Sequence, residues 1–178
     1  MSALGIYTNI LSDIKNWMYE FTSVTTKSSN PDLLNVNLSV ERIKRGVFAL
    51  SGEFYLNIDM VEGDGNELEL TSFRSANGDG DYKSLPLEMS RRHFYDALNT
   101  HYKNVVMDTF KDCSDLPFFE DEFPAPLEKK TYTLDKCQFS QEGMPNHLES
   151  GQYKIILSGY GEVEWEVEVI VEVEPNME

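Results

Sequence analysis

The sequence has few of the residues from which enzymes build active sites. It contains three histidines and two cysteines, and it shows none of the patterns HExxH, CxxC, GxSxG or a phosphate-binding P-loop. His93 and His101 are separated by more than two turns of an expected helix, so one metal ion could not take both as ligands. We therefore expect no catalytic residues, no metal, no cofactor and no enzyme activity.

Positive charge is also scarce. The chain has 15 Lys and Arg against 31 Asp and Glu, which gives a formal net charge of −16. A field of that sign repels phosphate backbones and anionic lipid headgroups, so we expect no nucleic acid partner. Acidity also keeps proteins dispersed in solution, which is the simpler explanation for it.

Long apolar runs are missing as well. No stretch approaches the roughly 18 apolar residues of a membrane-spanning helix, and the first residues lack the basic and apolar regions of a signal peptide. Cys113 and Cys137 allow one disulfide at most, which fits a secreted domain but equally fits two buried thiols in a cytosolic one. The sequon Asn37-Leu38-Ser39 gives weak support for secretion. If the protein is secreted, we expect its signal peptide to be absent from this sequence.

What the sequence does contain is alternation of period two, which is typical of β-strands. The strongest run covers 163–173, where apolar residues alternate mainly with glutamate. A second run covers 48–60 and is interrupted by Gly52, which predicts a bulge or bend. Shorter runs occur at 132–134 and 153–157. The turn residues of 62–66 predict a hairpin from the second run into a strand that contains Leu68 and Leu70.

One helix is expected between the two β halves. It would begin after Ser90 as the N-cap and end near Asp112. Its apolar face would carry Phe94, Leu98, Tyr102 and Val105. The segment 113–130 is rich in proline and acids, so we predict an extended loop there, which also carries Phe118, Phe119 and Phe123. The predicted fold is mainly β, an antiparallel two-sheet β-cup or sandwich with one amphipathic helix, in a single domain over 1–178.

The string 77–81, Asn-Gly-Asp-Gly-Asp, resembles the start of a calcium-binding loop. Counting onward places Glu88 at the twelfth position, but Tyr82 occupies the sixth position, where the sharp turn of such a loop needs glycine. A hairpin or connecting loop is the better interpretation.

The stretch FPAPLEKKTYTLDKCQFSQEGMPNHLESGQYKIILSG, residues 123–159, resembles the C-terminal half of the ganglioside activator protein family and its insect chemosensory relatives. The shared pattern is a proline-led basic turn, then Thr131-Tyr132, a Met144-Pro145 corner, and Gly151-Gln152-Tyr153 opening a strand. Two upstream segments, RIKRGVFALSGEFYLNIDM and FYDALNTHYKNVVMDTFKDCSDLP, are similar to the insect branch. The first thirty residues match poorly.

This resemblance implies an antiparallel β-cup, in which two sheets are splayed around an apolar cavity. It also implies a secreted protein that binds a lipid, or another apolar ligand such as a pheromone or cuticular compound, and presents it to a receptor, membrane or enzyme. The family usually has several disulfides, and Phe123 stands here where the family has a cysteine. We predict one disulfide, between Cys113 and Cys137.

The strand faces and the aromatic loop together predict a ligand cavity between the sheets. Aromatic stripes are more often core than ligand wall, so a protein-interaction sandwich with a packed interior, acting through its acidic surface, stays the alternative. The predicted ligand-binding residues are Phe48, Leu50, Phe54, Leu56, Ile58, Tyr153, Ile155, Leu157, Trp165, Val167 and Val169 in the walls, with Phe118 and Phe119 as a gate.

Overall fold

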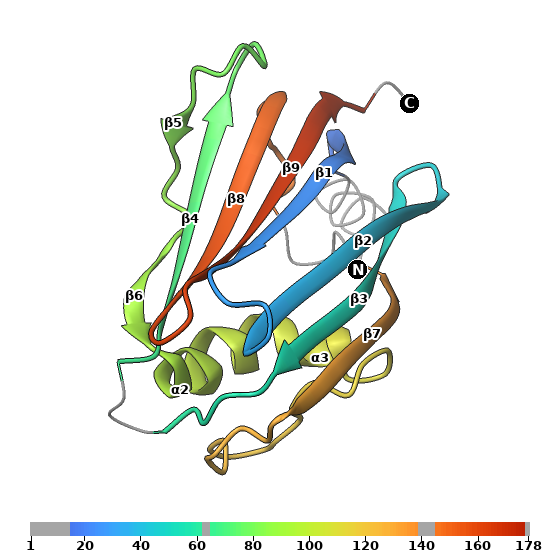
Figure 1. The fold of residues 1–178 in the computed structure, drawn as a ribbon. Helices are drawn as coiled ribbons and strands as arrows, with labels where there is room; N and C mark the ends of the chain where they lie inside the picture. The colour runs from blue at the N-terminus through green and yellow to red at the C-terminus, as the bar shows by residue number, and fades with distance from the viewer. Residues whose placement is uncertain (1–14, 62–64, 139–144, 177–178) are drawn as a thin grey trace, which may run out of the picture.

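The computed structural model describes residues 15–61, 65–138 and 145–176, which fold into two antiparallel sheets that face each other (Figure 1). The larger sheet has the strand order β1 (Trp17–Ser28), β9 (Trp165–Pro175), β8 (Gly151–Tyr160) and β4 (Glu67–Ser75). Two short strands, β5 (Lys83–Ser84) and β6 (Met89–His93), pair with the free edge of β4. The smaller sheet has the order β2 (Leu34–Lys44), β3 (Val47–Leu56) and β7 (Lys130–Gln138). The predicted fold class is confirmed.

Alternation of side chains decides which face of each strand turns inward. In the larger sheet the valine row of β9 lies level with Ile155 and Leu157 of β8 and with Val24 of β1. The glutamate row lies on the other face, where Lys27 of β1 pairs with Glu166 at 3.7 Å. In the smaller sheet the inward residues of β2 alternate with Asn35, Asn37 and Ser39. Each sheet therefore offers one apolar face to the other.

Gly52 is required by a close backbone approach inside the smaller sheet. Its φ is +150°, and a Cβ at this position would lie 2.0 Å from the carbonyl oxygen of Asn37. The register of β3 against β7 also shifts between Leu50 and Gly52. The irregularity predicted at Gly52 is confirmed, and it lies in the pairing with β7.

The predicted hairpin over 62–66 is wrong. Residues 62–64 lie outside the described part of the chain, but the strands on either side, β3 and β4, belong to different sheets. Glycine and acidic residues mark a change of chain direction, and they favour a crossing between sheets as readily as a tight hairpin.

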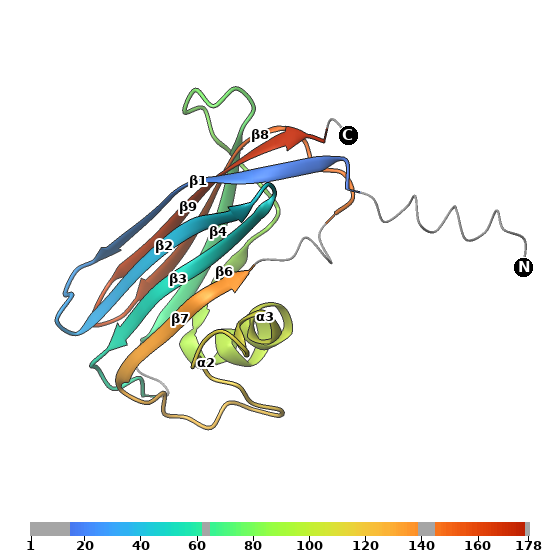
Figure 2. The ribbon, with the colours of Figure 1, turned by 90° about the vertical axis from the view of Figure 1, so that its right-hand side faces the viewer.

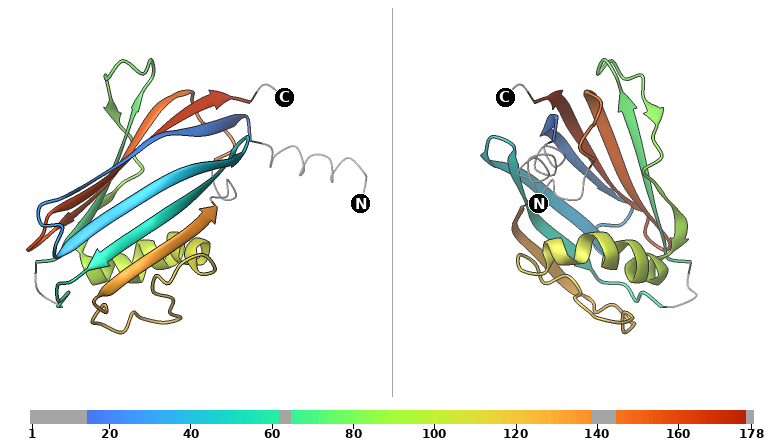
Figure 3. Two further views of the ribbon diagram at one scale, coloured as in Figure 1. Left: turned by 45° about the vertical axis from the view of Figure 1, so that its right-hand side comes forward. Right: turned by 180° about the vertical axis from the view of Figure 1, so that it is seen from behind.

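The helical segment runs without a break from 94 to 110, as α2 (Phe94–Ala97), a π-helical stretch η1 (Leu98–Val106) and α3 (Met107–Phe110). It lies between β6 and β7, on the side of the molecule away from β1 and β2 (Figures 2 and 3). The predicted N-cap at Ser90 is wrong, because Ser90 belongs to β6 and His93 caps the helix, its ring nitrogen accepting from the amide of Tyr95.

The predicted apolar face of the helix holds only in part. Phe94 and Leu98 are buried and Tyr102 is half-buried, but Val105 is 71% exposed. A π-helix turns less per residue than an α-helix, so a stripe counted at α-helical spacing drifts around the helix and leaves the core.

A disulfide joins Cys113, just after the helix, to Cys137 of β7, as predicted. Neighbouring contacts strengthen the attachment, since the amide of Asp135 donates to the carbonyl of Cys113 at 2.8 Å. Asp115 also binds β7, because its carboxylate accepts hydrogen bonds from Lys130 and from the amide of Thr133. Partial burial raises the pKa of Asp115, but these hydrogen bonds have the larger effect, and its pKa is lowered overall. The end of the helix is thus fixed to the outer edge of the smaller sheet.

Candidate functional site

The apolar interior of the described chain is divided into two clusters. The larger one, which we call the helix-end core, joins both sheets to the helix through residues such as Leu34, Leu56, Phe94 and Trp165. The smaller one, the hairpin-end cluster, consists of Trp17, Tyr19, Phe48 and Val173. A domain usually has one contiguous core with smaller satellite clusters. Here the residues at the boundary between the two clusters, such as Val24, Leu38 and Val40, are only partly buried.

A cleft of about 490 Å³ lies at this division, between the edge strand β1 of the larger sheet and the edge strand β2 of the smaller sheet. Its volume falls in the range of small-molecule sites in proteins, about 300–1,000 Å³. The lining residues are Glu20, Phe21, Thr22, Ser23, Val24, Leu38, Ser39, Val40, Arg42 and Phe48.

The apolar lining comes from both clusters. Phe21, Val40 and Phe48 belong to or pack against the hairpin-end cluster, while Val24 and Leu38 pack against the helix-end core. Four of these five side chains are only partly buried, and Phe48 is fully buried. An apolar ligand in the cleft would cover the partly accessible carbon of both sheets at once, which is a source of binding free energy.

A β-bulge shapes the wall that β1 contributes. The register of β1 against β9 shifts between Phe21 and Ser23, so Thr22 has no partner residue on β9. The bulge lets Phe21 on one side and Val24 on the other both face the small sheet, although they are three residues apart. Bulges of this kind are common where a strand borders a binding site.

Aromatic rings form one end of the cleft. The ring centroid of Phe21 lies 5.3 Å from that of Phe48 in an edge-on arrangement, and Tyr19 lies 5.5 Å from Phe48. Burial raises the pKa of Tyr19, so its phenol is neutral at physiological pH. Neutral aromatic rings therefore form the wall at this end of the cleft.

The rim of the cleft carries one ion pair. Arg42 Nη1 of β2 lies 3.8 Å from Glu20 Oε1 of β1, and both side chains are about half exposed, at 53% and 54%. An exposed pair of this kind contributes at most about 1 kcal/mol to folding. Its position matters more than its strength, because it places a cation and an anion beside an apolar cleft.

Inward-facing residues at the centre of the inter-sheet space are also incompletely buried. Ile155, Leu157, Val169 and Val171 lie on central strands and face the smaller sheet, yet all four are only partly buried. Leu50, on the facing strand β3, is partly buried too. Residues at the centre of a tightly packed sandwich would be closed off from solvent, so the two sheets do not fully seal each other along this line.

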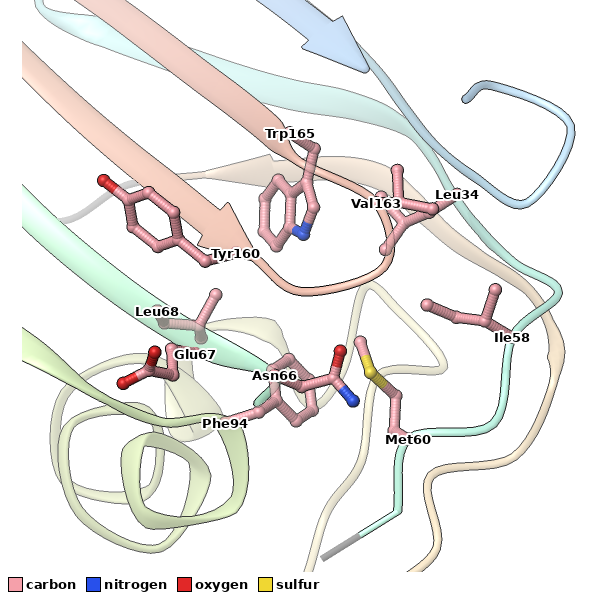
Figure 4. A pocket seen from close by; sticks show the side chains of 10 residues that line it. All are labelled: Leu34, Ile58, Met60, Asn66, Glu67, Leu68, Phe94, Tyr160, Val163 and Trp165. Carbon is pink, nitrogen blue, oxygen red and sulfur yellow. The ribbon is translucent and has the colours of Figure 1, made fainter. Parts of the chain in front are cut away.

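A second hollow lies beside the helix, where side chains from both sheets converge with Phe94 (Figure 4). It leaves no room for a water molecule. Trp165, with 9% of its surface exposed, stacks over Gly159, where a Cβ would lie 1.9 Å from the indole nitrogen. This end is filled by side chains and cannot take a ligand without rearrangement.

The structure distributes the predicted ligand-binding residues over three environments. Among the described residues that line the cleft, Phe48 is the one that the sequence predicted. Buried in the helix-end core are Leu56, Ile58, Trp165 and Val167. Partly buried on the inner faces of the two sheets are Leu50, Phe54, Tyr153, Ile155, Leu157 and Val169. That these residues wall a ligand cavity stays a prediction.

The two residues predicted as a gate differ from each other. Phe118 is 59% exposed. Phe119 is buried, stacked on Tyr102 with ring centroids 6.3 Å apart, and edge-on to Phe123 at 5.4 Å. Phe119 thus packs the proline-rich loop onto the helix, and only Phe118 has the exposure of a mobile gate.

The string 77–81 forms a closed turn between β4 and β5. Asp79 Oδ1 accepts from Ser75 Oγ at 3.1 Å and from the amide of Asp81 at 3.0 Å, and these hydrogen bonds lower the pKa of Asp79. Within the part of the chain that the structure describes, no three His, Cys, Asp or Glu side chains are grouped to hold a metal ion. The connecting-loop interpretation accounts for the string.

Most of the cleft lining escaped the sequence analysis, although a signal was present. Leu34, Val36, Leu38 and Val40 alternate with polar residues, and the aromatic residues Trp17, Tyr19 and Phe21 recur at every second position. These are two strands of period two. The bulge at Thr22 shifts the alternation of β1 by one residue. An alternation of period two that starts from Trp17 therefore does not place Val24 on the inward face.

Comparison with known protein families matches part of the chain. Residues 68–155, slightly less than half of the chain, match a family model described as "Protein of unknown function (DUF1091)". No curated protein matches the chain. The matched segment contains the helix, the disulfide and β7, whereas the cleft-lining residues lie before it. Within residues 15–61, 65–138 and 145–176, no helix combines the length and apolar character needed to cross a bilayer.

Proposed function

We propose that the protein is a secreted carrier of a lipid or another apolar small molecule, which it holds in the cleft between β1 and β2 and passes to a receptor, membrane or enzyme. No covalent step is involved. The observation that carries the proposal is the division of the interior into two clusters by a cleft of about 490 Å³, in which apolar residues make up half of the lining.

Three further features support this function. The partly buried inner faces of β8, β9 and β3 continue the apolar surface from the cleft into the inter-sheet space. The resemblance to the ganglioside activator family and its insect chemosensory relatives, in residues 123–159 above all, associates this type of fold with lipid binding. The disulfide supports secretion, because disulfides persist mainly in oxidising compartments.

The first experiment asks whether the protein carries a ligand at all. Purified protein is extracted with organic solvent, the extract is examined by mass spectrometry, and the stripped protein is titrated with a fluorescent fatty acid. We expect saturable binding of the probe. A lack of saturable binding would contradict the carrier function.

A matched pair of variants places the probe in the cleft. Phe21→Ser removes a ring from the cleft wall, and Phe73→Ser removes the same ring from the outer face of the larger sheet. Loss of one phenyl contact is expected to weaken probe binding about tenfold or more in Phe21→Ser and to leave it unchanged in Phe73→Ser. Urea unfolding of both variants separates a loss of binding from a loss of folding.

The alternative is an interaction domain that acts through its acidic outer face. The filled helix-end core favours it, since this core holds most of the buried residues of the two clusters and is packed as in an ordinary sandwich. In that case the extract would contain no bound lipid, the probe would not saturate, and Phe21→Ser would lower only stability.

A further inference from the structure

A concentration of positive charge lies at one end of this acidic molecule. The end of β2 and the turn that follows it carry Arg42, Lys44 and Arg45 within four residues, out of 15 Lys and Arg in the chain. All three are exposed. We call residues 42–46 the basic tip.

The basic tip also exposes an aliphatic side chain. The register of β2 against β3 shifts between Arg42 and Lys44, which leaves Ile43 without a partner residue, and Ile43 is 45% exposed. Gly46, with a φ of +76°, allows the chain to reverse immediately afterwards. An exposed apolar residue flanked by cations is the composition of a surface that enters the interface of a membrane.

The basic tip stands at the mouth of the cleft. Arg42 itself lines the cleft, and Arg45 reaches across to β1, with Nη2 3.8 Å from the sulfur of Met18. Phe48, at the aromatic end of the cleft, is the register partner of Arg42. A surface that contacts the tip is therefore next to the opening through which a ligand would pass.

Negative charge lies at both ends of the molecule. Glu162 and Glu164 lie exposed in the turn between β8 and β9, and the carbonyl of Glu164 accepts from the amide of Ser29, just after β1 ends (Figure 1). The 11 residues of β2 separate this turn from the tip by about 35 Å, well beyond the Debye length in physiological salt. Closer to the tip, Glu20 is paired with Arg42, Glu41 is exposed, and Glu172 and Glu174 of β9 are the register partners of Glu20 and Met18 on β1. Docking on an anionic surface therefore depends on the exposed cations of the tip and not on the charge of the whole molecule.

We propose that the basic tip docks on an anionic lipid bilayer, with Lys44 and Arg45 contacting headgroups, Ile43 entering the interface and the mouth of the cleft facing the membrane. The inference rests on the proposed carrier function, because it names the membrane as the surface with which the cleft exchanges its ligand. Each cation near an anionic membrane strengthens binding about fivefold. Docking is then weak and reversible, as exchange requires.

The test measures sedimentation of the full chain with vesicles of phosphatidylcholine, with and without phosphatidylserine, at low and at physiological salt. We expect binding that requires phosphatidylserine and weakens with salt. The double variant Lys44→Glu/Arg45→Glu should weaken it by at least about 25-fold. The matched control Lys83→Glu/Lys111→Glu makes the same change in net charge at exposed positions on β5 and after the helix, and it should bind like the wild type.

Several outcomes would overturn the proposal. These are equal binding to both kinds of vesicle, equal weakening by the two double variants, and binding to soluble heparin with no binding to phosphatidylserine vesicles. The last would assign the tip to a soluble acidic partner. Ile43→Ser should weaken vesicle binding without removing its dependence on phosphatidylserine.

Probe titration in the absence of vesicles keeps this proposal distinct from the carrier function. If the probe saturates but vesicles do not bind, the carrier function stands and docking fails. If vesicles bind through the tip but the probe does not saturate, docking stands and the carrier function fails.

Discussion

The helix-end core and the hairpin-end cluster lie between the same two sheets but are closed in different ways. At the helix end, a helix fills the space between β6 and β7, and a disulfide fixes the end of that helix to β7 (Figures 2 and 3). On the opposite side, within the part of the chain that the structure describes, no helix covers the space between the edges of β1 and β2, and the cleft opens there. A two-sheet fold can thus be stable at one end while it stays accessible at the other.

This difference separates stability from binding along the molecule. Side chains in the helix-end core contribute mainly to the free energy of unfolding, because their removal leaves a cavity that the fixed surroundings cannot fill. Side chains of the cleft are already partly accessible to solvent. Compared with removal of a side chain from the helix-end core, their removal should lower the free energy of unfolding less and weaken ligand binding more. The predictions below test this separation.

The largest effect is expected for Trp165→Ala. The indole is buried against Phe54, with ring centroids 5.8 Å apart, and it fills the space above Gly159. We expect the free energy of unfolding to fall by about 3–5 kcal/mol, measured by urea unfolding followed by circular dichroism. Phe21→Ala should cost clearly less. Equal losses in the two variants would show that the two ends are packed alike.

Removal of the disulfide should have the next largest effect. Cys113 and Cys137 are 24 residues apart, and a crosslink over a loop of this size stabilises a fold by about 3 kcal/mol. We expect the free energy of unfolding of Cys113→Ser/Cys137→Ser to fall by about that amount. Relative to the wild type, hydrogen exchange should accelerate more in the helix than in β8 and β9. Titration of the denatured, unreduced wild type should find no free thiol, and two thiols per chain would contradict the pairing.

Alkaline pH should weaken the helix side specifically. Burial raises the pKa of Tyr102 to about 12, and burial, with the nearby charges of Glu128 and Asp115, raises that of Tyr132 to about 12. The folded state therefore holds these two protons more tightly than the unfolded chain does, whose tyrosines titrate near pH 10. Their contribution to stability is complete below about pH 10 and is lost as pH rises towards 12.

The measurement is the free energy of unfolding across this pH range, with tyrosine ionisation followed by absorbance. Tyr102→Phe/Tyr132→Phe should show a smaller loss between pH 10 and 12 than the wild type. The same slope in both proteins would mean that other groups cause the alkaline loss. Tyr153 is an internal reference, because burial also raises its pKa but it packs against the hairpin-end cluster.

The sequence predicted the fold class well because strand alternation is a local signal. The glutamate and valine rows of β9 identify an amphipathic strand from composition alone. The pairing of β3 with β7 and the crossing from β3 to β4 were not predictable in this way, since turn residues do not report which strands become neighbours. The disulfide followed from having two cysteines and from a family resemblance.

The cleft was harder to predict for a physical reason. Trp165 and Phe48 have the same kind of alternating neighbourhood in the sequence, yet one packs beside the helix and the other lines the cleft. What separates them is the distance between two sheets and the place where the helix lies, which are properties of the assembled fold. A bulge at Thr22 and a π-helical stretch over 98–106 added two local departures from regular spacing.

The smallest effect on stability is expected for Phe118→Ser. Because this side chain is 59% exposed, its removal should change the free energy of unfolding by no more than about 0.5 kcal/mol. Phe119→Ser, one position away, removes a ring that is packed against Tyr102 and Phe123 and should cost about 3 kcal/mol.

The same pair decides whether the loop takes part in binding. If the ligand occupies the cleft between β1 and β2, a fluorescent fatty acid should leave Phe118→Ser at the same rate as the wild type, because Phe118 does not lie among the described lining residues. Stopped-flow release of the probe into excess acceptor vesicles measures that rate. Faster release from Phe118→Ser at unchanged stability would contradict this expectation, and it would give Phe118 the gating role that the sequence suggested.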